Sequence, residues 1–449
     1  MIRNVLIKKI FFQYYNSVWL SSFIIILLLG IFSSACRKVV IKKDTSSSPI
    51  KFFTGSNTDK VSKIEITADG GFIYCGYTTL DSSNVDAFMM KVDSNGNQEW
   101  YKTYGGRNYD DFRDATQCAD GGFVAVGSTN SFSIGAATGS RDLGDYMVKT
   151  DRNGTVLWYK SIGTNITLLQ HVIEMPDKNI VTTGYYYDGD WNITLMKFMP
   201  DGGFIFHRKY PNVAIIPPFY LPKRYHEYAT WVGVAQNGNL MVGGVMDKSY
   251  NVSDVQRHLT FLMTTDEANG NPKFLYIDTT NVRDWYFWNG VNPYRLSTVK
   301  ALSFQDGFLL GTDLEFPGSM QLQLTQLDLN GNKQWDRKYP GLGNSIFYDI
   351  ATCPDGGVLM MGASTSGSIN FSFQEGFRNL KGMLKKVDAN GNEIWTQYNG
   401  SNQNVSMIKA AKPLTFGGWA IAGNNCINEK GYDKMFWMSV DENGKIKSE

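Results

Sequence analysis

The side chains that most often carry enzyme chemistry are sparse in this sequence. It has four histidines, at positions 171, 207, 226 and 258, and neither a His-x-x-His nor a Cys-x-x-Cys pair, so spacing indicates no zinc site. It also lacks a Gly-x-Ser-x-Gly nucleophile motif and a phosphate-binding loop. The one local cluster is His226 with Glu227 and Arg224, which is more typical of a solvated loop than of a catalytic group. The sequence therefore predicts no catalytic residue, no metal site and no cofactor.

Two further patterns are explained better by structure than by ligand binding. Asp-x-Asn-Gly-Asn strings begin at Asp93, Asp328 and Asp388 and are similar to calcium loops, but their Gly stands at the fourth place instead of the sixth. Asn-Gly favours a tight hairpin, because both residues can adopt positive φ. Beyond Cys36 there are four cysteines, at 75, 118, 353 and 426, and we expect free, buried thiols.

The composition excludes several classes of protein. The chain has 449 residues, of which 43% are apolar, so it can build a large packed core and is not disordered. The formal net charge is +1, and this balance excludes a nucleic-acid-binding surface. The 45 glycines and the 14% of aromatic residues predict many strands joined by tight turns.

The first 36 residues resemble the signal of a bacterial lipoprotein. Arg3, Lys8 and Lys9 precede an uncharged run over 10–35, which ends in small residues before Cys36. The resemblance implies that Cys36 is lipidated and becomes the first residue of the mature chain. An uncleaved membrane anchor is the alternative, since a span needs about 20 residues and the run is long enough.

Both alternatives attach a soluble body to a membrane. Residues 37–49 are rich in Lys and Ser and are predicted to form a flexible tether. We expect a lipid-anchored protein of the bacterial cell envelope, on the outer membrane and on its periplasmic side rather than at the cell surface.

Residues 50–449 repeat one unit seven times. The unit begins with a block such as DGGFIYCGYT (69–78) or DGGFVAVGST (120–129), and continues with a block such as FMMKVDSNGNQEW (88–100). Each unit is predicted to form four strands with Gly-rich turns, and the segment shows no sustained helical periodicity. Four-stranded units of this length cannot bury both faces alone, so they are predicted to stack radially into a propeller.

Two features indicate a closed ring. An aromatic residue follows the second turn Gly by four positions in six units, and we expect it to pack between neighbouring sheets: Trp100, Trp158, Phe206, Phe274, Trp335 and Trp395. The seventh unit ends before its fourth strand, whereas residues 50–55 carry that missing strand. The sequence thus predicts an all-β, seven-bladed β-propeller of four-stranded antiparallel blades, closed by an N-terminal strand that completes the last blade.

The segment over 86–129 resembles the bacterial seven-bladed β-propeller (SBBP-type) repeat. It runs from Asp-Ala-Phe through a Gly turn to a Gly-Gly pair, and the spacing of Asp93, Gly96 and Trp100 is similar to the docking motif of quinoprotein propellers. In that second family adjacent cysteines usually accompany a quinone cofactor, and this sequence has none. The resemblance implies the architecture and leaves the function open.

The long, variable connections of the predicted ring are the candidate binding surface. Residues 210–227 and 277–295 leave consecutive units and are rich in aromatic and Arg side chains, which suit a protein or glycan interface. A small satellite core that holds both loops down is the alternative. The predicted ligand-binding residues are Phe219, Tyr220, Arg224, Tyr225, Trp285, Tyr286, Trp288 and Tyr294.

Two functional hypotheses follow. The first is a membrane-tethered, monomeric, non-catalytic lipoprotein that binds a protein partner or a glycan through its variable-loop face. The second is a propeller enzyme, either a glycan hydrolase or lyase or a quinoprotein, that acts at the central channel. Convergence of Asp, Glu and His in the channel would favour the enzyme, whereas an aromatic and uncharged lining would favour binding alone.

Overall fold

A computed structural model describes most of the repeat region. The described residues are 50–53, 58–80, 84–132, 143–161, 167–211, 226–248, 256–285, 299–316, 319–365, 380–399, 405–415, 417–426 and 433–446. They belong to one compact unit over Pro49–Ser448. The predicted signal (1–36), with Cys36, and the predicted tether (37–49) lie outside them. None of the described segments forms a helix long and apolar enough to span a bilayer.

The first four blades follow one another along the chain, and each is an antiparallel four-stranded sheet. Blade 1 contains β2 (Asp59–Ile66), β3 (Phe72–Thr79), β4 (Val85–Val92) and β5 (Gln98–Tyr104). Blade 2 contains β6 (Asp110–Gln117), β7 (Phe123–Thr129), β8 (Gly144–Thr150) and β9 (Val156–Lys160). Blade 3 contains β10 (Thr167–Glu174), β11 (Ile180–Tyr187), β12 (Trp191–Phe198) and β13 (Phe204–Tyr210). Blade 4 contains β14 (His226–Val234), β15 (Leu240–Lys248), β16 (Gln256–Thr265) and β17 (Pro272–Trp285).

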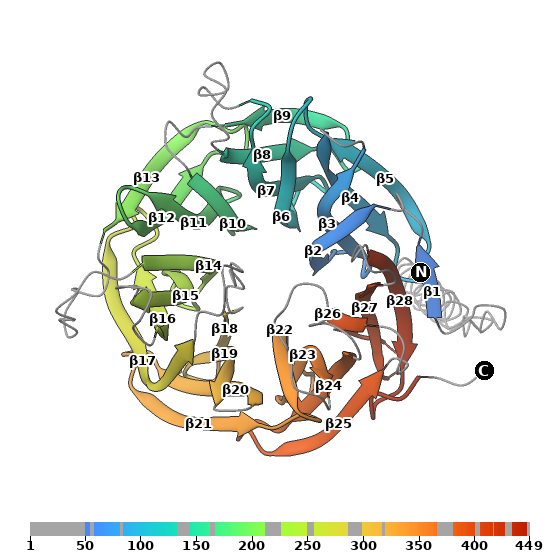
Figure 1. Ribbon diagram of the computed structural model, residues 1–449, viewed down its shortest axis with the longest axis vertical. Coiled ribbons are helices and arrows are strands. Elements are labelled where there is room, and N and C mark those ends of the chain that lie inside the picture. The colour runs from blue at the N-terminus through green and yellow to red at the C-terminus, as the bar shows by residue number, and fades with distance from the viewer. Residues whose placement is uncertain are drawn as a thin grey trace, which may run out of the picture. The chain divides into compact units, whose positions relative to one another are not determined.

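The last three blades complete a ring (Figure 1). Blade 5 contains β18 (Lys300–Phe304), β19 (Gly307–Phe316), β20 (Ser319–Asp328) and β21 (Lys333–Tyr339). Blade 6 contains β22 (Asn344–Thr352), β23 (Val358–Thr365), β24 (Lys381–Val387) and β25 (Glu393–Asn399). Blade 7 contains β26 (Val405–Pro413), β27 (Trp419–Cys426), β28 (Asp433–Val440) and β1 (Ile50–Phe53). The prediction of an all-β, seven-bladed propeller is confirmed.

The ring closes through its N-terminal strand, as the repeat count predicted. Strand β1 pairs antiparallel with β28, with Ile50 opposite Met438 and Phe53 opposite Met435. Blade 7 therefore combines the two ends of the repeat region. This pairing covers the backbone groups along one side of β28 that would otherwise form an open sheet edge.

Five of the repeated aromatic residues, in blades 1, 2, 3, 5 and 6, pack against a turn glycine of the next blade, as predicted. The indole Nε1 of Trp100 in blade 1 donates a hydrogen bond of 3.2 Å to the carbonyl oxygen of Arg152 in blade 2. Its ring covers Gly154, where an added Cβ would lie 3.0 Å from the ring carbon Cζ3. In blade 7 a different strand supplies the ring, because Trp437 of β28 covers Gly96 of blade 1. The docking contact is therefore kept at the closure of the ring.

The Asp-x-Asn-Gly-Asn strings form hairpin turns. The Asp93 carboxylate accepts hydrogen bonds from the backbone N–H groups of Asn95 and Asn97, at 2.9 and 2.7 Å. Gly96 has a φ of 76°, which is the left-handed conformation that the turn requires. The turn itself thus occupies the Asp93 oxygen that a calcium ion would need.

Six blades share an irregularity in the strand nearest the centre. In blade 2, Phe112 pairs with Gly127 and Asp114 pairs with Val126, so Arg113 is an extra residue that forms a β-bulge. The bulge brings the Asp111 carbonyl oxygen to 2.0 Å from the place where a Cβ on Gly127 would stand. Only glycine fits there, and the equivalent glycines of the other blades are Gly76, Gly184, Gly244, Gly362 and Gly423.

We predict that the substitution Gly127→Ala destabilises the fold strongly, because the new Cβ would overlap a backbone oxygen that cannot move without breaking the bulge. The expected loss is about 3 kcal/mol, measured by guanidinium unfolding. Gly121→Ala is the matched control, since Gly121 has a φ of 83° and nothing lies within 4 Å of its added Cβ. The control should lose only about 1 kcal/mol through backbone strain. Equal losses would show that the bulge contact is not the constraint.

Candidate functional site

The bulges set charged side chains at the centre of the ring. Lys63, Asp114, His171 and Asp349 each follow the bulge in the innermost strand of their blade. Figure 1 shows that these strands, β2, β6, β10 and β22, line the middle of the ring. Glu65 of β2 and Lys300 of β18 contact the same group, through Lys63 and Asp349 respectively. These six residues are called the channel cluster below.

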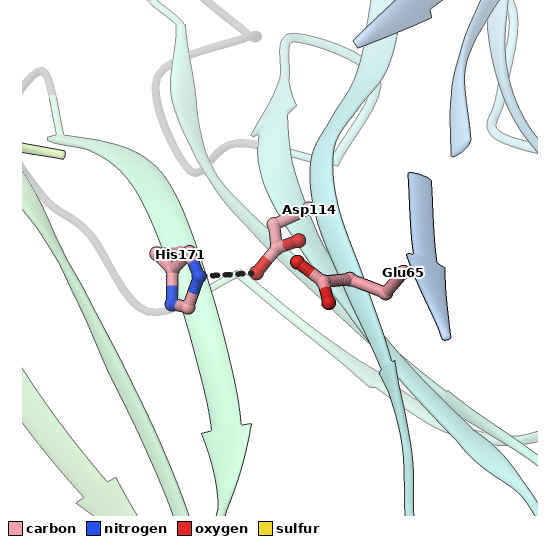
Figure 2. Close-up of side chains that lie close together, drawn as sticks. All are labelled: Glu65, Asp114 and His171. Atoms are coloured by element: carbon pink, nitrogen blue, oxygen red, sulfur yellow. Dashed lines mark ion pairs between the residues drawn. The ribbon is translucent and has the colours of Figure 1, made fainter. Parts of the chain in front are cut away.

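Three members of the channel cluster meet from three consecutive blades. One ligand atom each of Glu65, Asp114 and His171 lies within 4.8 Å of the other two. Figure 2 shows the three side chains pointing toward one another from β2, β6 and β10. The Nε2 atom of His171 lies 3.6 Å from Oδ2 of Asp114, which also accepts a 2.9 Å hydrogen bond from the Val172 backbone N–H. Acidic groups and an imidazole thus converge in the channel.

Two buried polar atoms of this trio have no hydrogen-bond partner among the described residues. They are Oδ1 of Asp114 and Nδ1 of His171. The Asp114 residue is only 1% exposed and His171 8% exposed. A buried polar atom without a partner costs about 1 to 3 kcal/mol, so these two atoms are costly to the fold.

Lysines supply the opposing charge. The Lys63 ammonium lies 3.3 Å from Oε1 of Glu65 and 3.6 Å from Oδ2 of Asp349. Lys300 forms a second ion pair with Asp349. Lys63 therefore connects blade 1 to blade 6 through the centre of the ring.

The surroundings shift the pKa values of the cluster in different directions. Burial raises the pKa of Asp114 above its ordinary value, and the charge of Lys63 opposes this only in part. Burial and the Lys63 charge lower the pKa of His171 to about 3. Burial opposes the charged form of Lys63, but Asp349, Glu65 and Asp114 more than compensate and raise its pKa. At neutral pH the site therefore offers the neutral imidazole of His171, the protonated ammonium group of Lys63 and the carboxyl group of Asp114, whose pKa is raised.

Glu65, Asp114 and His171 also have donor types that bind a divalent cation. The ammonium group of Lys63 already lies beside Glu65, so a cation at this place would be repelled by a neighbouring positive charge. Ion pairing to Lys63 satisfies the charge of Glu65 without a metal. Proton transfer is the chemistry that this arrangement favours.

The side chains differ in their access to solvent. The side chain of Glu65 is 25% exposed and that of Lys63 is 17% exposed, whereas that of Asp114 is 2% exposed. Lys300 is as accessible as Lys63. Within the channel cluster, Glu65 and the two lysines are therefore more accessible to solvent than Asp114.

The structure does not test the residues predicted to bind a ligand. Phe219, Tyr220, Arg224, Tyr225, Tyr286, Trp288 and Tyr294 lie outside the described residues, and Trp285 is described only as the last residue of β17. They remain predictions. In the predicted cluster at His226, Nδ1 of the ring accepts a hydrogen bond from the Trp191 backbone N–H, and Glu227 is fully buried. Cys75, Cys118 and Cys353 are free and buried, as expected, while the side chain of Cys426 is not described.

A sequence pattern could have predicted the channel cluster, but it was not recognised. Lys63, Asp114, His171 and Asp349 each stand six positions before the first residue of the repeated turn, which is Asp69, Asp120, Asp177 and Asp355. Blades 4 and 7 carry Trp231 and Ala410 after their bulges. A charged or ionisable residue at one fixed strand position in four units is visible only when the units are aligned with one another.

Comparison with known proteins identifies the fold. No family model matches the sequence, and no curated protein matches it either. A solved polysaccharide lyase, a PL25 ulvan lyase, superposes with a TM-score of 0.52 and 10% identity over 88% of this chain and 97% of that chain. The same enzyme bound to -[GlcA(1-4)Rha3S]- gives a TM-score of 0.51. The polysaccharide lyase Uly1 gives 0.50 at 9% identity, over 87% of this chain and 91% of that chain. At such low identity the likeness concerns the fold.

These findings correct the functional prediction. We predicted a non-catalytic binding protein with no catalytic residue, and that prediction was wrong. Solved propellers that share the fold include polysaccharide lyases, which are enzymes. The channel meets the criterion set for the alternative of a glycan-processing enzyme, because Glu65, Asp114 and His171 converge there. The few histidines and the absence of a linear motif misled the prediction, since this cluster is assembled from separate blades.

We predict that His171 makes the fold sensitive to mild acid. Its pKa is about 3 in the folded chain against an ordinary value near 6.5, so protons bind only to the unfolded chain as the pH falls through this window. Stability is therefore lost between pH 6.5 and about 3, and His171→Gln removes this loss. Between pH 7.5 and 5.5 the unmodified chain should lose about 1.4 kcal/mol more than the variant, measured by urea unfolding. Equal losses would mean that His171 titrates normally.

Proposed function

We propose that this chain is an enzyme that cleaves an acidic polysaccharide at the centre of its propeller. The observation that carries the proposal is the convergence of Glu65, Asp114 and His171 beside the Lys63 ammonium, at a place where the fold does not require charge. The polysaccharide lyases that share the fold support the substrate class, and one of them was solved with a glucuronate-containing ligand.

Eliminative cleavage of a uronate needs three functions, and the channel cluster offers all three. A cation must stabilise the negative charge that develops on the sugar carboxylate, and Lys63 keeps its proton and is partly exposed. A base must remove the proton next to that carboxylate, and an acid must protonate the departing sugar oxygen. Glu65 lies at the accessible side as the base, and Asp114 has the raised pKa of the acid.

His171 is a positioning residue in this scheme. Its neutral imidazole lies 3.6 Å from Asp114 and offers no competing positive charge, because its pKa is about 3. A protonated imidazole here would pull the Asp114 proton away and lower the pKa of that carboxyl group. The neutral ring thus maintains the acid that the reaction needs.

Hydrolysis is the second candidate, because two carboxyl groups lie close together. Glu65 and Asp114 present oxygens within 4.8 Å of each other, and their surroundings differ, since Asp114 is buried and Glu65 is partly exposed. A buried acid paired with an accessible carboxylate is also the arrangement of glycoside hydrolases. The reaction products distinguish the two, because only elimination leaves an unsaturated sugar that absorbs ultraviolet light.

We predict that the purified chain releases unsaturated fragments from one of a panel of uronate polysaccharides: ulvan, polygalacturonate, alginate and glucuronan. Ultraviolet absorbance measures elimination, and a reducing-sugar assay measures total cleavage. Asp114→Asn and Glu65→Gln should each lower kcat about 100-fold or more, since each removes a proton-transfer group. His171→Gln should lower kcat less and move the acidic limb of the pH profile.

His207→Gln is the matched control. It replaces another histidine of blade 3, but on the outermost strand β13, where Nε2 of His207 lies 2.7 Å from the Thr194 hydroxyl. It should leave kcat unchanged. Equal losses in the control and in His171→Gln, or full activity in Asp114→Asn, would contradict the proposed site. Reducing ends without ultraviolet absorbance would replace elimination by hydrolysis.

We also propose that Cys36 carries a lipid that anchors this SBBP-type propeller to the bacterial outer membrane on its periplasmic side, where it acts as a monomer. The signal-like segment before Cys36 supports this proposal. Cys36→Ser should abolish labelling by radioactive palmitate and move the chain from the membrane fraction to the soluble fraction. An unlabelled parent chain that stays in the membrane fraction would favour the uncleaved anchor instead.

A further inference from the structure

One arginine on an innermost strand pairs with a buried carboxylate and is also partly exposed. Arg113 is the extra residue of the bulge in β6 and directly precedes Asp114. Its Nε atom lies 2.6 Å from Oδ2 of Asp111, and Asp111 is 1% exposed. The Arg113 side chain itself remains 39% exposed. The Nε atom is buried and forms an ion pair with Asp111 but no hydrogen bond, while other parts of the side chain reach solvent.

The carboxylate that holds Arg113 is itself held firmly. Oδ1 of Asp111 accepts hydrogen bonds from both the backbone N–H and the hydroxyl of Ser128. The hydroxyl of Tyr109 donates a 3.2 Å hydrogen bond to the other oxygen, Oδ2. The carboxylate that pairs with the guanidinium is thus held in place by a hydrogen-bond network within blade 2. An arginine paired with a fixed carboxylate loses less side-chain entropy when a ligand binds to it.

The outer edge of the guanidinium has no partner in the described part of the chain. No hydrogen bond there involves Nη1 or Nη2 of Arg113, and the one ion pair of this residue there is with Asp111. The two terminal nitrogens of an arginine form a planar fork that matches the two oxygens of a carboxylate, or two oxygens of a sulfate. Asp111 neutralises the overall charge, so the remaining attraction depends on this geometry.

Phenol groups from three blades contribute to the electrostatic surroundings of Arg113. Asp111 raises the pKa of Arg113 against the effect of burial, and Tyr109, Tyr185 and Tyr77 raise it further. The Tyr109 hydroxyl donates to the same Asp111 oxygen, Oδ2, that lies beside Nε of Arg113. The rings of Tyr77 and Tyr109 lie 5.9 Å apart. The ring of Tyr185 packs edge-on against Trp191, at 5.2 Å. Rigid aromatic faces beside an arginine suit the ring of a sugar, because the faces pack against its carbon atoms while the fork binds its acidic group.

We propose that Arg113, with Tyr109 and Tyr77 beside its Asp111 contact, is a subsite for the anionic group of an acidic sugar. The inference rests on the proposed function, since the subsite would hold a substrate unit next to the channel cluster. The occupant is an acidic sugar residue whose anionic oxygens bind Nη1 and Nη2. A uronate and a sulfate ester offer the same chemistry, and the experiment distinguishes them.

The experiment measures equilibrium binding by calorimetry on the full chain carrying Asp114→Asn, so that cleavage does not consume the probes. The probes are hexasaccharides of polygalacturonate, of sulfated dextran and of unmodified dextran. Binding of the first probe assigns a carboxylate, and binding of the second assigns a sulfate. The anionic probe that binds should lose at least about tenfold in affinity with Arg113→Lys, which keeps the charge but removes the fork.

Arg208→Gln is the matched control, because Arg208 also has its Nε held, by the Asn269 carbonyl oxygen at 2.6 Å, but on the outermost strand β13. It should change affinity less than twofold. Melting temperatures identify any variant that fails to fold, and Arg113→Gln provides a second variant. Unchanged affinity in a folded Arg113→Lys chain, binding of the dextran probe alone, or no binding of any probe would overturn the subsite.

The outcomes separate the subsite from the proposed function. If the anionic probes bind through Arg113 while the parent chain cleaves none of the uronate polysaccharides, the subsite is supported and the proposed enzyme activity is contradicted. If the parent chain cleaves such a polysaccharide and Arg113→Lys leaves the KM unchanged, the enzyme activity is supported and the subsite is contradicted.

Discussion

The structure depends on one contact that six blades repeat. The innermost strand has a β-bulge, and the bulge packs directly against a glycine of the second strand. The extra residue brings a backbone oxygen to about 2 Å from the place of a Cβ, so the second strand must carry glycine there, as Gly127 does opposite Phe112. The bulge also shifts the strand register by one residue. This shift determines which side chain, such as Asp114 in blade 2, lies at the centre of the ring. Closure of the ring by β1 and β28 then holds these positions around one axis.

The charged residues of the channel cluster are better explained by a function than by a contribution to stability. Buried ion pairs add little to stability, because the desolvation of both charges offsets their attraction. Blades 4 and 7 fill the same position with Trp231 and Ala410, so the fold accepts apolar residues there. The charged residues of blades 1, 2, 3 and 6 also leave Oδ1 of Asp114 without a partner among the described residues. Groups kept at such a cost are typical of catalytic sites.

The sequence was sufficient for the fold because the fold is repetitive. The Gly turns, the aromatic residue after each turn and the strand over 50–55 each recur or complete a pattern, and Trp100 lies where its spacing predicted. The site was harder to predict because Glu65, Asp114 and His171 are far apart in the chain and form no linear motif. Their meeting depends on the bulges, and no residue type marks a bulge until the units are aligned. The predicted binding loops were chosen for their aromatic composition, which carries no information about the channel.

A crystal structure of the Asp114→Asn chain with a bound acidic oligosaccharide tests the central claim most directly. The account predicts a sugar in the channel, with its glycosidic oxygen within hydrogen-bond distance of residue 114 and its carboxylate beside Lys63 or Arg113. An oligosaccharide bound only on the outer strands, or a channel filled by side chains with no room for a sugar, would contradict it.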